Sequence, residues 1–133
     1  MTLHLEFQDN VAVLRHDDGK RNVFSPDSIR DFNEALDEIE AKKAALMWMG
    51  REDCFSAGFD LKVVKSGDAD AAAAMVQAGG ELAFRIFTFP HPVVCAVTGH
   101  CLALGSVMLV CADKRIGMAG DFKYGLNETA IDM

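Results

Sequence analysis

The chain has 133 residues, of which 50% are hydrophobic and 25% charged, a length and mixture that fit one folded domain and exclude a disordered or low-complexity segment. Thirteen basic against twenty acidic residues give a net charge of −7, which argues against a protein that binds nucleic acid through a basic surface. No basic segment precedes an apolar one at the N-terminus, so no secretion signal is visible and we expect a cytoplasmic protein.

The first predicted element is a β-hairpin. Residues 3–7 alternate apolar and polar side chains, Asp9-Asn10 suits a turn, and the alternation continues at Val11, Val13 and Arg15. Alternation with a period of two is typical of strands that bury one face. We therefore expect two short antiparallel strands at the start of the chain.

A well-marked helix follows the loop of residues 17–22. Ser25 suits the position that caps a helix, Pro26 the first helical position, and Asp27 the positive end of the helix dipole. Large apolar side chains then recur every three or four residues, which places them on one face: Ile29, Phe32, Leu36 and Ile39. The pattern predicts a helix that packs this face against the core.

Strands and helices alternate through the middle of the chain. Residues 44–49 and 92–97 are short apolar runs, which predict buried strands. Between them, residues 68–87 are alanine-rich and predict a helix, although Gly79-Gly80 weakens its middle. A strand–helix–strand order implies a crossover connection in an α/β fold with helices covering the sheet.

Residues 102–112 are apolar on every side and predict a helix enclosed by protein. The longer stretch 93–112 has no charged residue and reaches the length of a membrane span. Thr98-Gly99-His100 interrupts it, so we favour a strand, a turn and a buried helix over a membrane segment. Further on, we predict a strand at residues 115–118, a short one around Tyr124, and a helix that begins in residues 125–129.

Four cysteines lie in or beside apolar runs: Cys54, Cys95, Cys101 and Cys111. Their spacing lacks the close pairs that zinc sites use, so we interpret them as free buried thiols and expect no metal site.

Two strand-to-helix junctions are rich in small residues. Ser56-Ala57-Gly58 follows one predicted strand, and Gly99, Ala103 and Gly105 follow another. Small residues let another group approach the backbone, and the first amides of a helix lack partners within it. Two such amides aimed at one point can bind an oxyanion. Tight packing of helix on sheet explains the same residues, and the spacing alone leaves both interpretations open.

Three motifs in chain order resemble the signatures of the crotonase family, also called the enoyl-CoA hydratase/isomerase family. Residues 55–62 (FSAGFDLK) resemble the first signature, residues 92–105 (PVVCAVTGHCLALG) the second, and residues 125–128 (GLNE) the segment with a catalytic glutamate. The resemblance implies an α/β fold, a crotonase-like spiral of βαβ units that binds an acyl-CoA thioester. It covers residues 1–133 as the N-terminal part of such a domain, with the C-terminal part absent.

The resemblance also implies a backbone oxyanion hole for the thioester oxygen. Its two donors fall on the amides of Phe59 and Leu104, where the family usually has glycine at the second position. The implied substrate-binding residues surround these two donors: Ala57, Gly58, Asp60, Leu61, Lys62 and Gly105. Lys62 and the Lys20-Arg21-Asn22 loop are implied to meet the nucleotide part of coenzyme A. No cofactor is expected, because the coenzyme A thioester is the substrate.

The carboxylates favour one family reaction over another. Family hydratases use two glutamates; Val107 occupies the position of the first and Glu128 that of the second. Valine cannot deprotonate water, whereas one glutamate suffices to move a double bond. The similarity therefore implies isomerisation with Glu128 as proton carrier, provided that an apolar pocket raises its pKa. The alternative is that Glu128 is only an acid at a helix start.

Family domains are longer than this chain, so the domain looks truncated, and we expect either a homo-oligomer (a trimer or dimer of trimers) or a partner that supplies the C-terminal half. The competing functional hypothesis is a non-catalytic or split-protein module that binds acyl-CoA or that partner half, with Val107 marking lost chemistry. A nucleic-acid or membrane partner is not expected.

Overall fold

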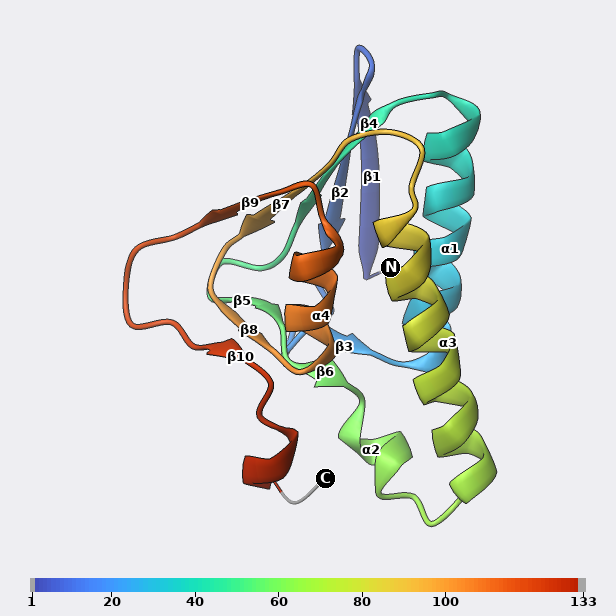
Figure 1. Cartoon of the computed structure of the whole chain (residues 1–133), viewed down its shortest axis with the longest axis vertical. Helices are drawn as coiled ribbons and strands as arrows, with labels where there is room; N and C mark the ends of the chain where they lie inside the picture. Colours follow the sequence, from blue (N-terminus) through green and yellow to red (C-terminus); the bar gives the residue numbers. More distant parts are fainter. Residues whose placement is uncertain (1, 132–133) are drawn as a thin grey trace.

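The computed structural model describes residues 2–131, and its largest element is a five-stranded sheet (Figure 1). The strands lie in the order β1-β2-β4-β7-β9. Only β1 and β2 pair antiparallel, as the predicted hairpin; the other neighbours run parallel. The bounds are Leu3–Gln8, Val11–His16, Ala45–Met49, Val93–Val97 and Lys114–Gly117, in that order.

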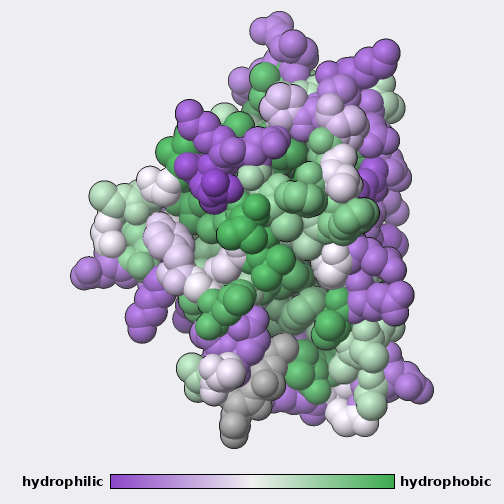
Figure 2. All heavy atoms as spheres, viewed as in Figure 1, coloured by the Kyte–Doolittle hydropathy of each residue, from purple (hydrophilic) through white to green (hydrophobic). Residues whose placement is uncertain are grey.

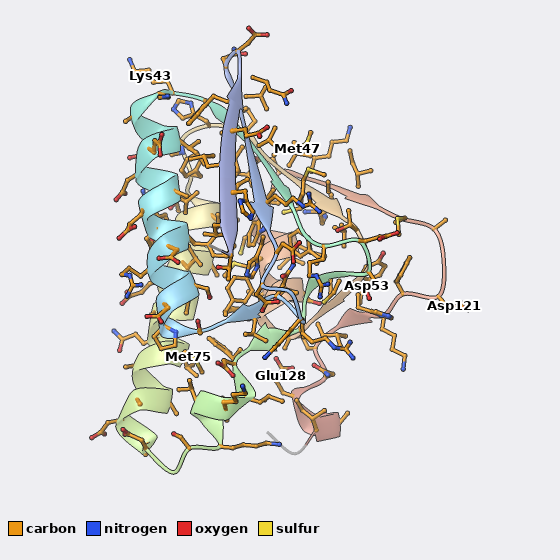
Figure 3. The ribbon with its side chains drawn as sticks, turned by 180° about the vertical axis from the view of Figure 1, so that it is seen from behind. Lys43, Met47, Asp53, Met75, Asp121 and Glu128 are labelled. Atoms are coloured by element: carbon orange, nitrogen blue, oxygen red, sulfur yellow. The ribbon has the colours of Figure 1, made fainter. Side chains whose placement is uncertain are left out.

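Three helices pack on one face of this sheet: α1 (Pro26–Ala41), α3 (Ala69–Phe87) and α4 (Leu104–Cys111) (Figure 1). The strands turn fully buried residues such as Leu46 and Trp48 toward them. Met47, labelled in Figure 3, alternates to the other face and is half-buried. The parallel strands with intervening helices confirm the predicted α/β crossover architecture.

Short strands form two smaller sheets at the edge of the molecule. One has the order β10-β8-β5 and the other pairs β3 with β6 in parallel. A short helix α2 and a 3-10 turn η1 complete the chain. The bounds of β10, β8 and β5 are Tyr124–Gly125, His100–Leu102 and Cys54–Ser56. Those of β3, β6, α2 and η1 are Val23–Phe24, Gly58–Phe59, Leu61–Val64 and Glu128–Ile131.

The second hairpin strand buries the opposite set of residues from the one that the alternation emphasised. Ala12, Leu14 and His16 are fully buried, whereas Val11 and Val13 are only half-buried. The two-residue turn pairs Gln8 with Val11, so odd-numbered residues of β1 share a face with even-numbered residues of β2. The turn length, which sets the register, decides which side chains of β2 face the core.

Helix α1 follows the sequence expectation closely. The Ser25 hydroxyl accepts the Ser28 N–H at 3.1 Å, the Ser28 hydroxyl accepts the Ser25 N–H at 2.9 Å, and Pro26 begins the helix. The predicted apolar face is buried without exception: Ile29, Phe32, Leu36 and Ile39. Local capping signals and a 3.6-residue period are therefore enough to predict where this helix begins and which face it buries.

The apolar stretch 93–112 folds as strand, turn, short strand and helix. Helix α4 begins at Leu104, two residues later than predicted, because His100–Leu102 pairs with β5 and β10 as β8. Within residues 2–131, no helix has the length and apolarity of a membrane span. The prediction that protein encloses α4 on every side is wrong at Val110, which is 72% exposed.

The last predicted helix is a single 3-10 turn, η1, as far as the structure describes it. Its expected final residues, 132–133, lie outside the described range. Helix α3, in contrast, runs without interruption through Gly79 and Gly80, so the two glycines do not break it.

Candidate active site

The first small-residue junction, between β5 and α2, turns one backbone amide away from its neighbouring strand. The Asp60 N–H donates to the Phe24 carbonyl at 3.0 Å, and β6 pairs with β3 in parallel, with Phe24 opposite Phe59. Neighbouring amides in an extended segment point to opposite sides. The Phe59 N–H, next to that of Asp60, therefore points away from β3.

The second junction ends in the N-terminus of α4, where two more amides have no helical partner. The Ala103 carbonyl accepts the N–H groups of Ser106 at 2.9 Å and Val107 at 3.2 Å. The N–H groups of Leu104 and Gly105 precede the first intrahelical bonds, so the helix offers them no acceptor. Ala103 itself has φ 54° and ψ −127°, a strained conformation that turns the chain into the helix.

Gly58 brings the two junctions together. A Cβ atom at this position would lie 3.2 Å from the Leu104 nitrogen and 2.6 Å from the Ala103 Cβ, and the φ of +95° also disfavours any side chain. Phe59, the residue after Gly58, carries one predicted oxyanion donor, and the Leu104 nitrogen next to Gly58 is the other. The structure therefore brings Phe59 and Leu104 into the same region, as the sequence predicts.

The Leu104 side chain, where the family usually has glycine, turns into the core. It is 6% exposed, and its Cδ2 lies 2.9 Å from the place that a Cβ on Gly79 would take. The Phe59 Cε1 lies 2.5 Å from the same point. Gly79 thus forms a notch in α3 that receives both side chains, while the two backbone amides belong to β6 and α4.

Glu128 begins the turn η1 and is half-buried. In Figure 3 it lies between α2 and η1. Three residues earlier, the Gly125 carbonyl accepts the Ala103 N–H at 2.9 Å, and the Gly125 N–H donates to the Ser106 hydroxyl at 3.0 Å. These contacts attach the segment that carries Glu128 to the first turn of α4.

A groove of about 540 Å³ gathers the basic residues that the sequence assigns to coenzyme A. Lys20, Arg21 and Lys62 line it together with Asp60. The Asp60 carboxylate also caps α2 by accepting the Lys62 N–H at 3.0 Å. Leu61 begins this short helix and is 38% exposed. The groove carries further acids, so its charge is mixed: Asp18, Asp27 and Asp31.

Asn22, grouped with these residues in the sequence, has a different role. It is fully buried, and its amide donates to the His16 carbonyl at 2.7 Å and lies 3.2 Å from the carbonyls of Cys54 and Phe55. These contacts with three main-chain oxygens attach the loop to β5, and they leave the Asn22 side-chain amide unable to bind a ligand. The expectation that Asn22 meets the nucleotide is therefore wrong.

A larger hollow, of about 660 Å³, lies on the helix-free face of the main sheet and includes none of the predicted site residues. Its lining mixes charged and apolar side chains from three strands and the loop after β4: His4, Glu6, Val13, Arg15, Met49, Gly50, Arg51, Glu52 and Thr98. Neither junction contributes to it, so its size alone does not make it the candidate site.

The cysteines are inert parts of the core. Cys54, Cys95 and Cys101 are buried as predicted, and Cys111 is half-buried. Burial raises the pKa of the Cys95 and Cys101 thiols to about 12, which keeps them protonated and unreactive. Among residues 2–131, no three His, Cys, Asp or Glu side chains are grouped as metal ligands.

Sequence reasoning missed two residues of this site, Gly79 and Ser106. Gly79 appears in the sequence only as a weak point of a helix, and Ser106 as one polar residue in an apolar run. Each is unusual for its segment, and that is the only local signal. Ser106 bonds Gly125, 19 residues further along the chain, and Gly79 faces Phe59 and Leu104, both at least 20 residues away.

Comparison with known proteins gives consistent results. A model of the enoyl-CoA hydratase/isomerase family matches residues 6–133. A putative enoyl-CoA hydratase of Thermus thermophilus is 30% identical over 91% of this chain and 49% of its own length. The chain spans about half the length of the curated relatives it matches.

Solved structures agree closely with the fold. An enoyl-CoA hydratase/isomerase family protein from Pseudomonas syringae superposes with a TM-score of 0.96 at 42% identity, covering 99% of this chain and 57% of the other. An apo structure described as an enoyl-CoA isomerase of Mycobacterium tuberculosis gives a TM-score of 0.90 at 36% identity, covering 99% and 57%.

Proposed function

Because the chain belongs to the crotonase (enoyl-CoA hydratase/isomerase) family and shares the fold of its solved members, we propose that it binds an acyl-CoA thioester. The protein then stabilises the enolate that forms when a proton leaves the carbon beside the thioester carbonyl. The observation that supports this proposal is the close approach of Gly58, the residue before Phe59, to the start of α4: a Cβ on Gly58 would lie 3.2 Å from the Leu104 nitrogen. The domain assignment proposed for residues 1–133 is the N-terminal part of such an acyl-CoA-binding domain.

Two backbone donors suit this chemistry for a physical reason. Negative charge grows on the thioester oxygen as the proton leaves, and preorganised N–H groups stabilise that charge without having to reorient; losing one such donor typically costs about 10²–10³ in rate. The Leu104 amide also lies at the positive end of α4, whose dipole adds to the attraction. Ala57, Gly58 and Gly105 supply the small residues that let the thioester approach.

We assign proton transfer to Glu128. Its carboxylate removes a proton from the carbon next to the thioester carbonyl of a 3-enoyl ester, the electrons move onto the oxygen, and the same carboxylic acid returns the proton two carbons further on. No cofactor takes part. Val107, at the position of the first of the two hydratase glutamates, has no titratable group, which favours double-bond isomerisation over hydration.

The nucleotide end of coenzyme A is proposed to occupy the groove of Lys20, Arg21 and Lys62. Lysine and arginine suit phosphate groups, and the groove supplies three such side chains beside its four aspartates. Asp60 and Leu61 shape the entrance beside the thioester, because α2 begins directly after the Phe59 amide.

The second candidate function is a non-catalytic module that binds acyl-CoA or a partner half. Two observations favour it: Val107 in place of a glutamate, and exposed apolar side chains on α3 and α4, namely Phe84, Phe87 and Val110. Figure 2 shows hydrophobic side chains gathered in the middle of the face that carries α4. A homo-oligomer or a partner C-terminal half would cover such a surface.

The test is turnover of 3-enoyl-CoA esters by the protein and by Glu128→Gln, a nearly isosteric change. We expect formation of the 2-enoyl ester and loss of at least about 10²-fold in kcat in the variant, with binding of the ester retained. Unchanged turnover in Glu128→Gln refutes the proton-carrier assignment. A parallel assay with 2-enoyl-CoA esters tests hydration, which would give a 3-hydroxyacyl product. Binding of both kinds of ester without turnover of either supports the module instead.

A further inference from the structure

The Ser106 hydroxyl contacts three main-chain atoms, two of them in Gly125, 19 residues further along the chain. Its Oγ lies 2.7 Å from the Cys101 carbonyl oxygen and 2.9 Å from the Gly125 carbonyl oxygen, and it accepts the Gly125 N–H at 3.0 Å. A hydroxyl has one proton and two lone pairs, so Ser106 accepts from Gly125 while it donates to one carbonyl at a time.

This contact joins the two halves of the candidate site. Ser106 is two residues after Leu104, whose amide is a proposed oxyanion donor, and Gly125 is three residues before Glu128, the proposed proton carrier. The Ala103 N–H donates to the same Gly125 carbonyl at 2.9 Å. The first turn of α4 therefore holds the Gly125 backbone at two points, one through the main chain and one through a side chain.

The helix itself does not need this hydroxyl. The Ser106 N–H already donates to the Ala103 carbonyl at 2.9 Å, and the position that caps α4 is occupied by Ala103, which has no capping side chain. Two of the three partners of the Ser106 oxygen belong to Gly125, on the neighbouring strand β10. The side chain thus acts between elements rather than within its own helix.

Beyond Gly125 the described residues fold into a tight turn. The Asn127 carbonyl accepts the N–H groups of Ala130 at 3.0 Å and Ile131 at 3.2 Å, which closes the turn η1 around Glu128. A displacement at Gly125 therefore moves the Glu128 turn with it, because only two residues separate them.

We propose that Ser106 is a positioning residue: its hydroxyl holds the Glu128 carboxylate at a constant distance from the oxyanion donors at the start of α4. This inference rests on the proposed function. The proposal accounts for the presence of a hydroxyl in an otherwise apolar helix. The next residue is Val107, so a second carboxylate is missing at the position where it would help to place a reacting group. Reaction rates are sensitive to such placement, because a shift of about 1 Å can cost 10²-fold.

The first experiment measures amide hydrogen exchange in the 133-residue chain and in Ser106→Ala. We expect exchange at Gly125 and Ala130 to be about tenfold faster in the variant, the effect of losing one net hydrogen bond. Ser106→Thr keeps the hydroxyl and should restore slow exchange. Thr88→Ala, which removes an exposed hydroxyl bonded to the Phe84 carbonyl at 2.9 Å, is the matched control and should leave both amides unchanged.

The second experiment measures isomerisation of a 3-enoyl-CoA ester. Ser106→Ala should lower kcat by between about tenfold and a hundredfold while KM stays nearly constant, because the coenzyme A groove is untouched. Ser106→Thr should recover most of the rate. In a Glu128→Gln background the same substitution should have no further effect on kcat, since the group that it positions is already gone.

The outcomes separate the two claims. If Glu128→Gln abolishes turnover but Ser106→Ala does not change kcat, the proposed function stands and the positioning role is refuted. If Glu128→Gln has no effect, or the unchanged protein shows no turnover, the proposed function fails, and the exchange experiment alone decides whether Ser106 holds the Glu128 turn. Unchanged exchange at Ala130 in Ser106→Ala overturns the inference in either case.

Discussion

Gly79 and Gly80 are adjacent in α3 and offer a matched pair of substitutions. A Cβ at Gly79 would lie 2.5 Å from Phe59 Cε1, 2.7 Å from Phe59 Cζ and 2.9 Å from Leu104 Cδ2, whereas a Cβ at Gly80 would meet nothing within 4 Å. Both sites are in the interior of the same helix. Both alanine variants therefore gain the same helix propensity. The difference between their free energies of unfolding measures the packing around the oxyanion donors.

The magnitudes follow from these contacts. Replacing an interior helical glycine by alanine stabilises by about 1 kcal/mol, which is the whole effect expected for Gly80→Ala. At Gly79 the new methyl group falls roughly 1 Å inside the comfortable carbon–carbon separation, and such overpacking costs about 1–3 kcal/mol. We expect Gly79→Ala to be less stable than Gly80→Ala by that amount, and to be no more stable than the unchanged protein.

Urea unfolding, followed by the fluorescence of the single tryptophan, Trp48, measures both free energies of unfolding. Gly79→Ala should also weaken binding of the thioester, because Phe59 and Leu104 must move to admit the methyl group. Leu104→Ala should cost less stability in the Gly79→Ala background than in the unchanged protein, because the new methyl group occupies part of the space that the leucine vacates. If Gly79→Ala stabilises the chain as much as Gly80→Ala does, the notch has no role in packing and the reasoning is wrong.

Three further predictions concern pH, capping and charge. Burial lowers the pKa of His16 from 6.5 to about 4 and outweighs the opposing effect of the nearby aspartates. As the pH drops, the imidazole of His16 is therefore protonated in the unfolded chain before it is protonated in the folded one. The free energy of unfolding should fall by about 3 kcal/mol between pH 6.5 and pH 4. His16→Leu should flatten this part of a stability-against-pH curve, and an unchanged slope would contradict the assignment. Ser25→Ala removes the cap of α1 and should cost about 1 kcal/mol, measured by thermal unfolding; a loss below the error of the measurement would show that the cap is dispensable. Lys62→Met should weaken binding of a coenzyme A ester about threefold, as expected for one exposed charge, without changing binding of the matching pantetheine ester; an equal loss for both ligands would place Lys62 away from the phosphates.

The sequence alone determines the elements whose signals are local. Helix α1 has its cap, its first-turn proline and its apolar period within 16 residues, and it begins at Pro26 as predicted. The buried strands β4 and β7 are likewise evident from short apolar runs between turns. Ordered motifs of small residues also sufficed to identify the family, because backbone approach and positive φ restrict those positions to a few residue types.

Tertiary structure decided everything that depends on contacts between distant segments. Neither the burial of the Leu104 side chain in the Gly79 notch nor the attachment of Gly125 to Ser106 leaves a pattern in the local sequence. The same holds for Asn22, a polar loop residue that ends fully buried between main-chain carbonyls. Side-chain periodicity reports which face of an element is apolar, but which surface meets that face depends on how the elements pack, and that is set only when the whole chain folds.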